Sequence, residues 1–234
     1  MEWSRSLAYF VGLIATDGCL SSDRRHIDFT SKDFEMVDMF TAFFGDRNRI
    51  GTKGRGGGPQ RYFRVQLGSV VFYQRLLSIG LTPRKSLTLG ALRIPDHVFP
   101  DFLRSHLDGD GTLNVYWDSV FPNSLRCYTR FHSASHDHLE WLQTTVSRLW
   151  GLGGAQACDC RVFRLSYAKG ASLELLKRIY YANDVPCLLR KRRIADAVLS
   201  GSYAEVVKLA NTRVSEARAE RLGGSTPPLR IPLP

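Results

Sequence analysis

The feature that most constrains this chain is a short pattern that occurs twice. Residues 10–18 read Phe-Val-Gly-Leu-Ile-Ala-Thr-Asp-Gly, and residues 103–111 read Leu-Arg-Ser-His-Leu-Asp-Gly-Asp-Gly. Both are apolar segments with helical spacing that end in Asp-Gly. Further segments recur in the same order, namely residues 30–34 with 134–138, 61–66 with 161–166, and 82–86 with 188–192. Four matches in one order indicate two homologous halves.

Each half is expected to have the element order α-β-β-α-β-β-α, which places the chain in the mixed α/β (α+β) class. The hydrophobic period changes from helical to two after each Asp-Gly, where Ile27 and Phe29 alternate with polar neighbours. We expect an N-terminal half with its connection at residues 1–95, a C-terminal half at 96–210, and a tail at 211–234. The tail ends in proline-rich sequence, so it is expected to be poorly ordered or to lie across the surface.

Local signals place the turns and helix starts of this pattern. The glycine-rich residues 54–59 lack the Gly-Lys-Ser/Thr ending of a phosphate-binding loop, so they predict a hairpin tip. The matching tip of the second half is expected near residues 158–160. Ser31 and Ser135 are expected to cap the helix that follows the second strand of each half. Residues 188–209 are predicted to be helical.

Composition favours a polyanionic partner and excludes several classes of protein. The net charge of +10 favours nucleic acid over a membrane surface. There is no apolar run of about 18 residues, so no transmembrane helix is expected. The N-terminal residues do not read as a signal peptide, so we expect a protein that is not secreted. Five irregularly spaced cysteines indicate reduced thiols in a bacterial cytoplasm or an organelle matrix, and they are poor evidence for zinc.

The predicted strands carry an apolar face and a face rich in Arg, Gln, Asn, Tyr and His. Such side chains reach base edges and phosphates, and a β-ribbon fits the major groove of DNA. The alternative is an ordinary solvated sheet face, although so many arginines are unusual there. A shift of one residue in register would move every candidate to the wrong face. The candidate DNA contacts are Arg24, Arg25, Asp28, Thr30, Arg49, Lys53, Arg55, Arg61, Tyr62, Arg64, Gln66, Asn114, Tyr116, Arg126, Tyr128, Arg130, His132, Arg161, Arg164 and Ser166.

The two Asp-Gly helices carry small residues four apart on one face, which lets two helix backbones approach closely. If these helices pack together, Asp17 and Asp110 emerge side by side at the same end. Two adjacent carboxylates repel each other unless a divalent cation neutralises them, and hard oxygen ligands favour Mg²⁺. Such a site suits phosphodiester hydrolysis, whereas an isolated Asp-Gly is more often a plain helix end. The expected helix-interface residues are Gly12, Thr16, Ser105 and Gly109.

With both motif copies in view, the chain resembles the LAGLIDADG homing endonucleases in their single-chain form with two motifs. The resemblance covers roughly residues 5–200, including the Pro-Arg-Lys segment before the second motif. It implies two pseudo-twofold αββαββα halves, with the motif helices at the central interface and saddle-shaped sheets along the DNA major groove. It also implies that Asp17 and Asp110 bind the catalytic metal, with the Thr16 or Gly18 backbone as an additional ligand.

The resemblance further implies a basic residue near each scissile phosphate. Lys85 and Lys191 are our candidates by position, ahead of the adjacent arginines, and they would orient water or stabilise charge in the transition state. Ser31 and Ser135 match a polar position that holds the water network, and their alternative role is a plain helix cap. The motifs depart from the family pattern at Ala15, Thr16, Ser105 and His106, and neither metal-binding acid is missing. We place His106 at the helix interface or in the core.

These observations predict a monomeric intron- or intein-type homing endonuclease with no obligate protein partner. It would make a Mg²⁺-dependent double-strand break at a long asymmetric site spanning roughly two turns of DNA. The resemblance implies that the cut leaves 3′ overhangs. The alternative is an RNA maturase or a DNA-binding regulator on the same fold. A structural or protein-interaction domain would leave the arginine-rich strand faces and the paired acids unexplained.

Overall fold

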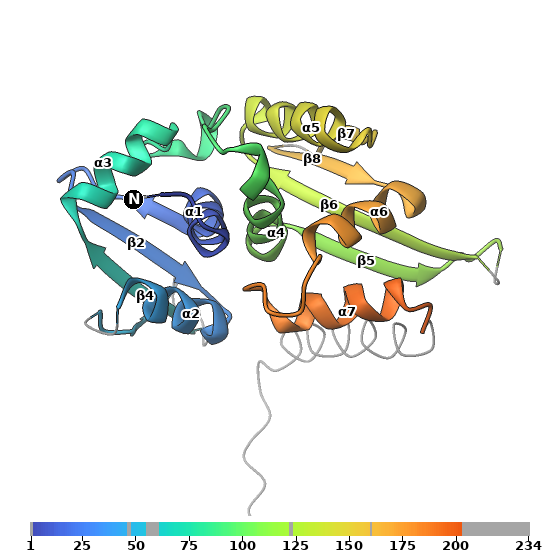
Figure 1. The fold of residues 1–234 in the computed structure, drawn as a ribbon, viewed down its shortest axis with the longest axis horizontal. Coiled ribbons are helices and arrows are strands. Elements are labelled where there is room, and N and C mark those ends of the chain that lie inside the picture. Colours follow the sequence, from blue (N-terminus) through green and yellow to red (C-terminus); the bar gives the residue numbers. More distant parts are fainter. Residues whose placement is uncertain (1, 46–47, 55–60, 122–123, 160, 203–234) are drawn as a thin grey trace, which may run out of the picture.

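A computed structural model describes residues 2–45, 48–54, 61–121, 124–159 and 161–202 of the chain (Figure 1). Arg55, most of the glycine-rich tip, the end of the predicted helix at 188–209 and the tail at 211–234 lie outside the described residues. In Figure 1, two units, each with a sheet and helices, stand on either side of a central helix pair.

The first unit is built around a four-stranded antiparallel sheet in the order β1-β2-β4-β3. Its elements are α1 (Arg5–Asp17), β1 (Gly18–Leu20), β2 (His26–Ser31), α2 (Phe34–Phe44), β3 (Gly51–Gly54), β4 (Arg61–Gly68) and α3 (Val70–Ile79). The predicted order α-β-β-α-β-β-α is therefore present, and two 3₁₀ turns follow in the connection, η1 (Lys85–Leu87) and η2 (Asp96–Val98).

The second unit repeats this arrangement with the strand order β5-β6-β8-β7. Its elements are α4 (Phe99–Gly109), β5 (Thr112–Trp117), β6 (Leu125–Ser133), α5 (His136–Trp150), β7 (Ala155–Asp159), β8 (Val162–Tyr167) and α6 (Lys169–Ile179). A last helix, α7 (Leu189–Leu199), follows within the stretch that was predicted to be helical. The mixed α+β class and the two-half architecture are confirmed.

Helix starts follow local capping in part, and here one prediction was wrong. Ser4 and Ser69 accept hydrogen bonds from the first turns of α1 and α3, at 3.1 and 3.2 Å. The residue that caps α2 is Asp33, not Ser31, because the Ser31 hydroxyl accepts the Asp33 N–H and ends β2 in a turn. Ser133 does the same for Ser135, so Ser31 corresponds to Ser133. Ser135 does precede α5, but its hydroxyl donates to the Leu89 carbonyl instead.

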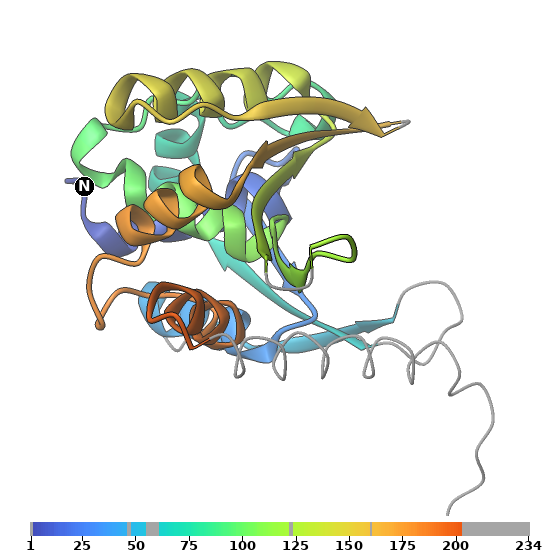
Figure 2. The same cartoon turned by 90° about the vertical axis from the view of Figure 1, so that its right-hand side faces the viewer.

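The core alternates along the strands with the expected period of two. Ile27 and Phe29 of β2 are fully buried, as are Phe131 of β6 and Leu165 of β8. The opposite strand faces are left to the polar side chains, and in Figure 2 the strands of both sheets extend past the helices to the same side of the molecule. Among the described helices, none has the length and apolar character needed to cross a membrane.

Candidate active site and nucleic-acid interface

Helices α1 and α4 pack against each other through the small residues that the sequence singled out. A Cβ on Gly12 would overlap the Ser105 hydroxyl and lie 2.8 Å from the Phe102 carbonyl oxygen. A Cβ on Gly109 would lie 2.8 Å from the Cβ of Thr16. Side chains essentially never approach a backbone this closely, so the two glycines are what allows the helices to meet. The four predicted interface residues therefore do lie between the helices.

The packed helices place Asp17 and Asp110 together at one end of the pair. Asp17 is the last residue of α1 and is half-buried, whereas Asp110 caps α4 and is exposed. Burial, together with the neighbouring charge of Asp110, raises the pKa of Asp17 to about 7. Although the Asp110 side chain reaches solvent, desolvation by the surrounding protein atoms also raises its pKa, and the ammonium groups of Lys85 and Lys191 oppose both shifts. The two acids and two lysines thus form one electrostatic unit.

Lys85 and Lys191 occupy equivalent positions behind the two carboxylates. Their side chains are only 6% and 1% exposed. The Lys85 ammonium donates to the Gly18 carbonyl, and the Lys191 ammonium donates to Gly111 at 2.8 Å, as well as to Leu107 and to Asp108 at 2.9 Å. Carbonyls at the C-terminal end of a helix favour a nearby cation, so each lysine stabilises the end of one motif helix. In this structure both ammonium groups contact backbone oxygens.

The two adjacent arginines differ in their surroundings. Arg84 is exposed and adopts a left-handed backbone conformation, with φ of 56°. Arg190, at the start of α7, makes two hydrogen bonds to Asp33 at the start of α2, at 2.9 and 3.2 Å. Arg190 therefore joins the two halves of the molecule through an ion pair.

The donor set beside Asp17 suits a hard divalent cation. The charge of Asp110 raises the pKa of Asp17, and a cation between the two carboxylates would remove that repulsion. The Thr16 hydroxyl lies 3.4 Å from Asp17 Oδ2, and the Gly18 carbonyl, one of the predicted ligands, already accepts the Lys85 hydrogen bond. A hollow of about 330 Å³ opens next to Asp17 and is lined further by Thr30, Lys53, Gly54 and Tyr62. It leads from the carboxylate onto the polar face of the first sheet.

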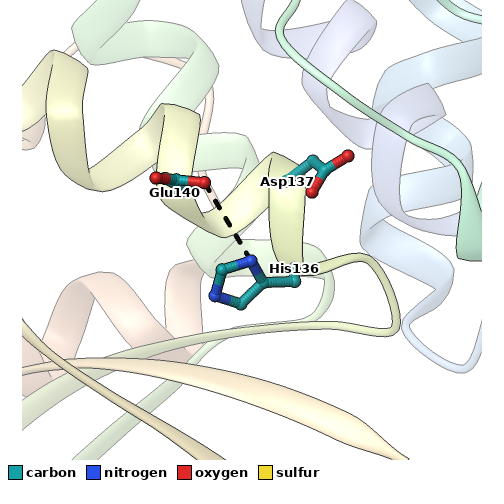
Figure 3. Close-up of side chains that lie close together, drawn as sticks. All are labelled: His136, Asp137 and Glu140. Atoms are coloured by element: carbon teal, nitrogen blue, oxygen red, sulfur yellow. Dashed lines mark ion pairs between the residues drawn. The ribbon is translucent and has the colours of Figure 1, made fainter.

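A second group of possible ligands lies on the surface of α5. His136, Asp137 and Glu140 are all exposed, and their ligand atoms lie within 4.8 Å of one another (Figure 3). His136 Nδ1 is 4.0 Å from Glu140 Oε2, an ordinary i,i+4 pair. None of the three lines the hollows at Asp17. This group is therefore separate from the paired aspartates.

The predicted contact residues in β2, β3 and β4 whose side chains are described share the open face of the first sheet. Register pairs Asp28 with Gln66, Thr30 with Arg64 and Lys53 with Tyr62. Arg64 Nε donates to Asp28 at 2.9 Å, which fixes the direction of the guanidinium across the strands. Arg24 and Arg25 lie exposed in the turn between β1 and β2, and Arg49 lies exposed before β3. Arg61 pairs with Gly54 in the ladder, and its side chain is outside the described part of the structure.

The second sheet repeats this face with different residues. Register pairs Asn114 with Tyr128, Tyr116 with Arg126, Arg130 with Ser166 and His132 with Arg164, and Arg161 lies exposed in the turn before β8. Arg126 forms an ion pair with Asp118 and Arg164 with Asp159. The Arg130 guanidinium lies 4.9 Å from the centre of the Tyr128 ring. The described candidates in these strands thus lie on the expected side of each sheet.

Sequence reasoning missed Asp108 and its partners. Asp108 is 1% exposed and accepts hydrogen bonds from the Tyr9 hydroxyl and the Leu188 N–H, both at 2.9 Å. A second buried network joins Arg104 to Asp101 and to the Ile179 and Pro186 carbonyls. The sequence did offer one signal for this network. Asp108 is the sixth residue of the second motif, and an acid there has no counterpart in the first motif, where Ala15 stands. His106 lies in the core, as predicted.

Comparisons with known proteins identify the architecture. No family model matches the sequence, and no curated protein matches it. Among solved structures, the LAGLIDADG meganuclease I-AabMI bound to uncleaved DNA has a TM-score of 0.57 at 15% identity, covering 92% of this chain and 98% of that chain. Variants of the homing endonuclease I-DmoI have a TM-score of 0.54 at 15% identity, covering 83% and 96%.

Another structural match carries a different name. Full-length DUF199/WhiA from Thermatoga maritima has a TM-score of 0.54 at 13% identity, covering 94% of this chain and 70% of that chain. Identities this low are evidence of fold alone. The chain therefore has the two-half LAGLIDADG fold shared by the homing endonucleases and DUF199/WhiA.

Proposed function

We propose that this protein is a site-specific DNA endonuclease that hydrolyses both strands of a long asymmetric target with Mg²⁺. The observation that carries the proposal is the pair Asp17 and Asp110, which meet at the ends of packed helices with a buried lysine behind each. Solved structures of I-DmoI in complex with DNA and Mn, and with DNA and Ca, have the same fold and support this choice.

The two open sheet faces are suited to double-stranded DNA. Each face would follow about one turn, or ~10 bp, of the major groove, so the target would span roughly two turns. Equivalent positions differ between the faces, since Asp28 and Gln66 in one half correspond to Arg130 and Ser166 in the other. An acceptor in one half and a cation in the other select different bases. We therefore propose a non-palindromic target, read by a monomer.

The chain's own residues divide the work at the cleavage site. Asp17 and Asp110 would hold the cation. The charges of the two lysines act to lower the pKa of both aspartates and so favour their ionised forms. When bound, the cation supplies a Lewis acid and lowers the pKa of water for hydrolysis. Lys85 and Lys191 hold the Gly18 and Gly111 carbonyls, so the ends of both motif helices stay fixed while DNA binds. One motif half would serve each strand, and staggered cuts would leave 3′ overhangs.

A second candidate is an RNA maturase or a DNA-binding regulator that does not cut. The match to full-length DUF199/WhiA, which covers 94% of this chain and does not carry the name of an endonuclease, fits this alternative. Both candidates use the same polar sheet faces. They differ in whether the paired aspartates are needed.

A cleavage selection separates the two candidates. The purified protein is incubated with a library of genomic or randomised duplex sites of ~22 bp, about two turns, with Mg²⁺ or with EDTA. We expect one asymmetric site to be recovered only with Mg²⁺, and Asp17→Asn or Asp110→Asn to abolish cleavage while DNA binding persists. Binding without cutting in wild-type protein would favour the regulator or maturase. Normal cutting by both variants would overturn the site.

A further inference from the structure

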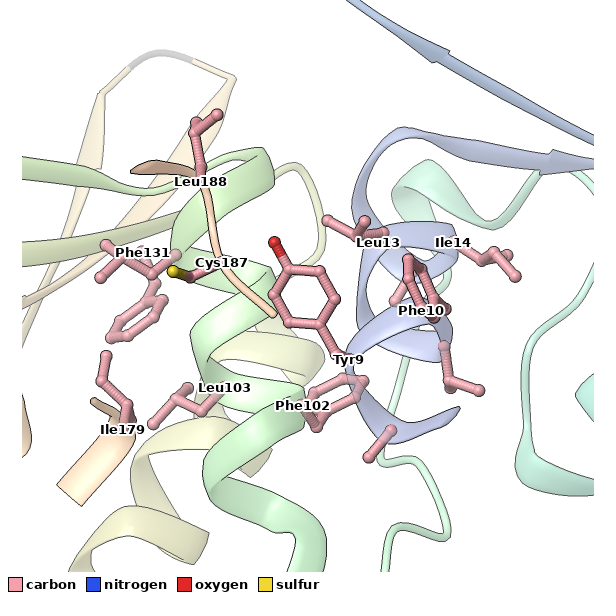
Figure 4. Packing of buried hydrophobic residues seen from close by; sticks show 14 of the residues in the cluster. Tyr9, Phe10, Leu13, Ile14, Phe102, Leu103, Phe131, Ile179, Cys187 and Leu188 are labelled. Carbon is pink, nitrogen blue, oxygen red and sulfur yellow. The ribbon is translucent and has the colours of Figure 1, made fainter. Parts of the chain in front are cut away.

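Tyr9 crosses from the N-terminal half into the C-terminal half. It belongs to α1, has no exposed surface, and donates its hydroxyl to Asp108 Oδ2 at 2.9 Å. Figure 4 shows its ring pointing away from α1 toward the segment that carries Cys187 and Leu188. Burial keeps the pKa of Tyr9 well above its ordinary value, so the hydroxyl remains a donor. The contact joins the two halves beside the cleavage site.

The same carboxylate holds the start of α7. Asp108 Oδ2 also accepts the N–H of Leu188 at 2.9 Å, and Leu188 is the residue that caps α7. The Lys191 N–H bonds back to the Leu188 carbonyl at 2.9 Å, and the Lys191 ammonium returns to the Asp108 and Gly111 carbonyls. The end of α4 and the start of α7 therefore hold each other in a closed loop of hydrogen bonds.

The N-terminal half has no equivalent of this loop among the described residues. Ala15 stands where the second motif has Asp108, and Phe102 stands where the first has Tyr9. Lys85 lies in a 3₁₀ turn, and its ammonium donates to the Gly18 carbonyl, whereas the Lys191 ammonium donates to three carbonyls. The Lys191 side is braced through Asp108 by Tyr9, a residue of the opposite half.

We propose that Tyr9 is a positioning residue for Lys191, acting through Asp108 and Leu188, and that it maintains the cleavage of one DNA strand. The strand assignment rests on the proposed endonuclease function, whereas the hold on Lys191 does not. Loss of the hydroxyl leaves Asp108 with fewer donors, loosens the start of α7 and lets Lys191 leave the end of α4. The site built on Lys85 keeps its contacts. The altered protein would then nick one strand much faster than it cuts the other.

The test compares Tyr9→Phe with Tyr73→Phe. Tyr73 is also fully buried, but its hydroxyl donates to the Ser21 carbonyl at 2.6 Å, a bond that stays within the N-terminal half. Amine acylation followed by mass spectrometry reports how often each lysine leaves its buried contacts. We expect Tyr9→Phe to raise the labelling of Lys191 by about fivefold or more, because the variant loses one hydrogen bond to a charged group. The labelling of Lys85 should not change. Tyr73→Phe should alter neither lysine.

A second variant, Leu188→Pro, tests the other end of the closed loop of hydrogen bonds. It removes the N–H that Asp108 accepts, and the φ of −77° at this position suits proline. The two variants should share the Lys191 phenotype although they touch different elements. Unchanged Lys191 labelling in both variants, or equal increases at Lys191 and Lys85, would overturn the proposal.

Strand cleavage completes the test. On a supercoiled plasmid carrying the selected site, Tyr9→Phe should accumulate nicked circles, with one strand slowed about tenfold at unchanged DNA affinity. Equal slowing of both strands would contradict the strand assignment. If wild-type protein cuts no DNA while Tyr9→Phe still exposes Lys191, the endonuclease proposal fails and the hold of Tyr9 on Lys191 stands.

Discussion

Asp17 is held where burial and the charge of Asp110 both act against its ionised form. Its pKa in the folded protein is about 7, against 3.8 for an unperturbed aspartate. Between these two values the unfolded chain binds fewer protons than the folded one, so stability must fall as the pH rises through that window. Above pH 7 the ionised Asp17 carboxylate continues to lower the free energy of unfolding. This is consistent with a carboxylate placed for binding a cation rather than for stability.

Asp17→Asn should therefore stabilise the cation-free protein at high pH. We expect the free energy of unfolding at pH 8 to rise by about 1–2 kcal/mol, a value reduced for the partial exposure of the side chain. At pH 3.5 the variant and wild type should be close. Urea unfolding at both pH values, in EDTA, measures this difference. Adding Mg²⁺ should raise the midpoint of wild type but not of the variant, and an equal rise in both would place the cation elsewhere.

Arg164 allows a test, at a single residue, of the prediction that the polar sheet faces bind DNA. It lies opposite His132 on the polar face of the second sheet and pairs with Asp159. Arg164→Ala should weaken binding to the selected duplex by about 1–3 kcal/mol and relax specificity at one base pair. Arg178→Ala is the matched control, because Arg178 is an exposed α6 arginine that also pairs with an acid, Glu174. If the two variants lose equal affinity in a binding titration, the effect of Arg164 is one of net charge alone.

At the scale of elements, the close contact between α1 and α4 determines the distance between the two acids. Gly12→Ala places a methyl group against Ser105 and 2.8 Å from the Phe102 carbonyl, which belongs to backbone and cannot rotate away. We expect a loss of about 2–4 kcal/mol in unfolding free energy, because the helices must separate. The stabilisation by Mg²⁺ should fall at the same time, since the carboxylates move apart.

Two matched variants give this experiment its controls. Gly153→Ala adds the same methyl group where nothing lies within 4 Å, so its stability should stay within about 0.5 kcal/mol of wild type. Ser105→Gly in the Gly12→Ala background removes the overlap with the hydroxyl but not with the carbonyl, so rescue should be partial. A Gly12→Ala protein as stable as wild type would show that the helices can separate without cost.

Elements with a strong period were predictable, and contacts between distant elements were not. The alternation around Ile27 and Phe29 specified which face of β2 is buried, because a one-residue slip would bury its polar face. The cap at Asp33 was missed because Ser31, a good capping residue, is used to end the strand instead. The contact of Tyr9 with Asp108 spans 99 residues of sequence and has no local signal. The burial of Lys191 likewise depends on where α7 docks.

At the scale of the whole molecule, the fold is symmetric and its surfaces are not. The two sheets share strand order and register, yet Asp28 occupies the position that Arg130 occupies in the other half. The bracing of the two lysines differs in the same way. Under the proposed function, the duplicated fold would present DNA with two different reading faces and two unequal cleavage sites.

A symmetrised target tests this asymmetry directly. Two palindromes are made, each from two copies of one half of the selected site, and their cleavage rates are compared with that of the parent duplex at fixed salt. Each palindrome puts one sheet on the wrong half-site, and each mismatched base pair costs about 1–3 kcal/mol. We therefore expect both palindromes to be cut at least about a hundredfold more slowly when several positions differ. Asp28→Ala removes the side-chain acceptor that has no equivalent in the other half. In this variant, the palindrome built from the half-site of the second sheet should be cut at a rate closer to that of the parent duplex. A palindrome cut as fast as the parent site would mean that the two faces read the same bases, despite the opposite charges at residues 28 and 130.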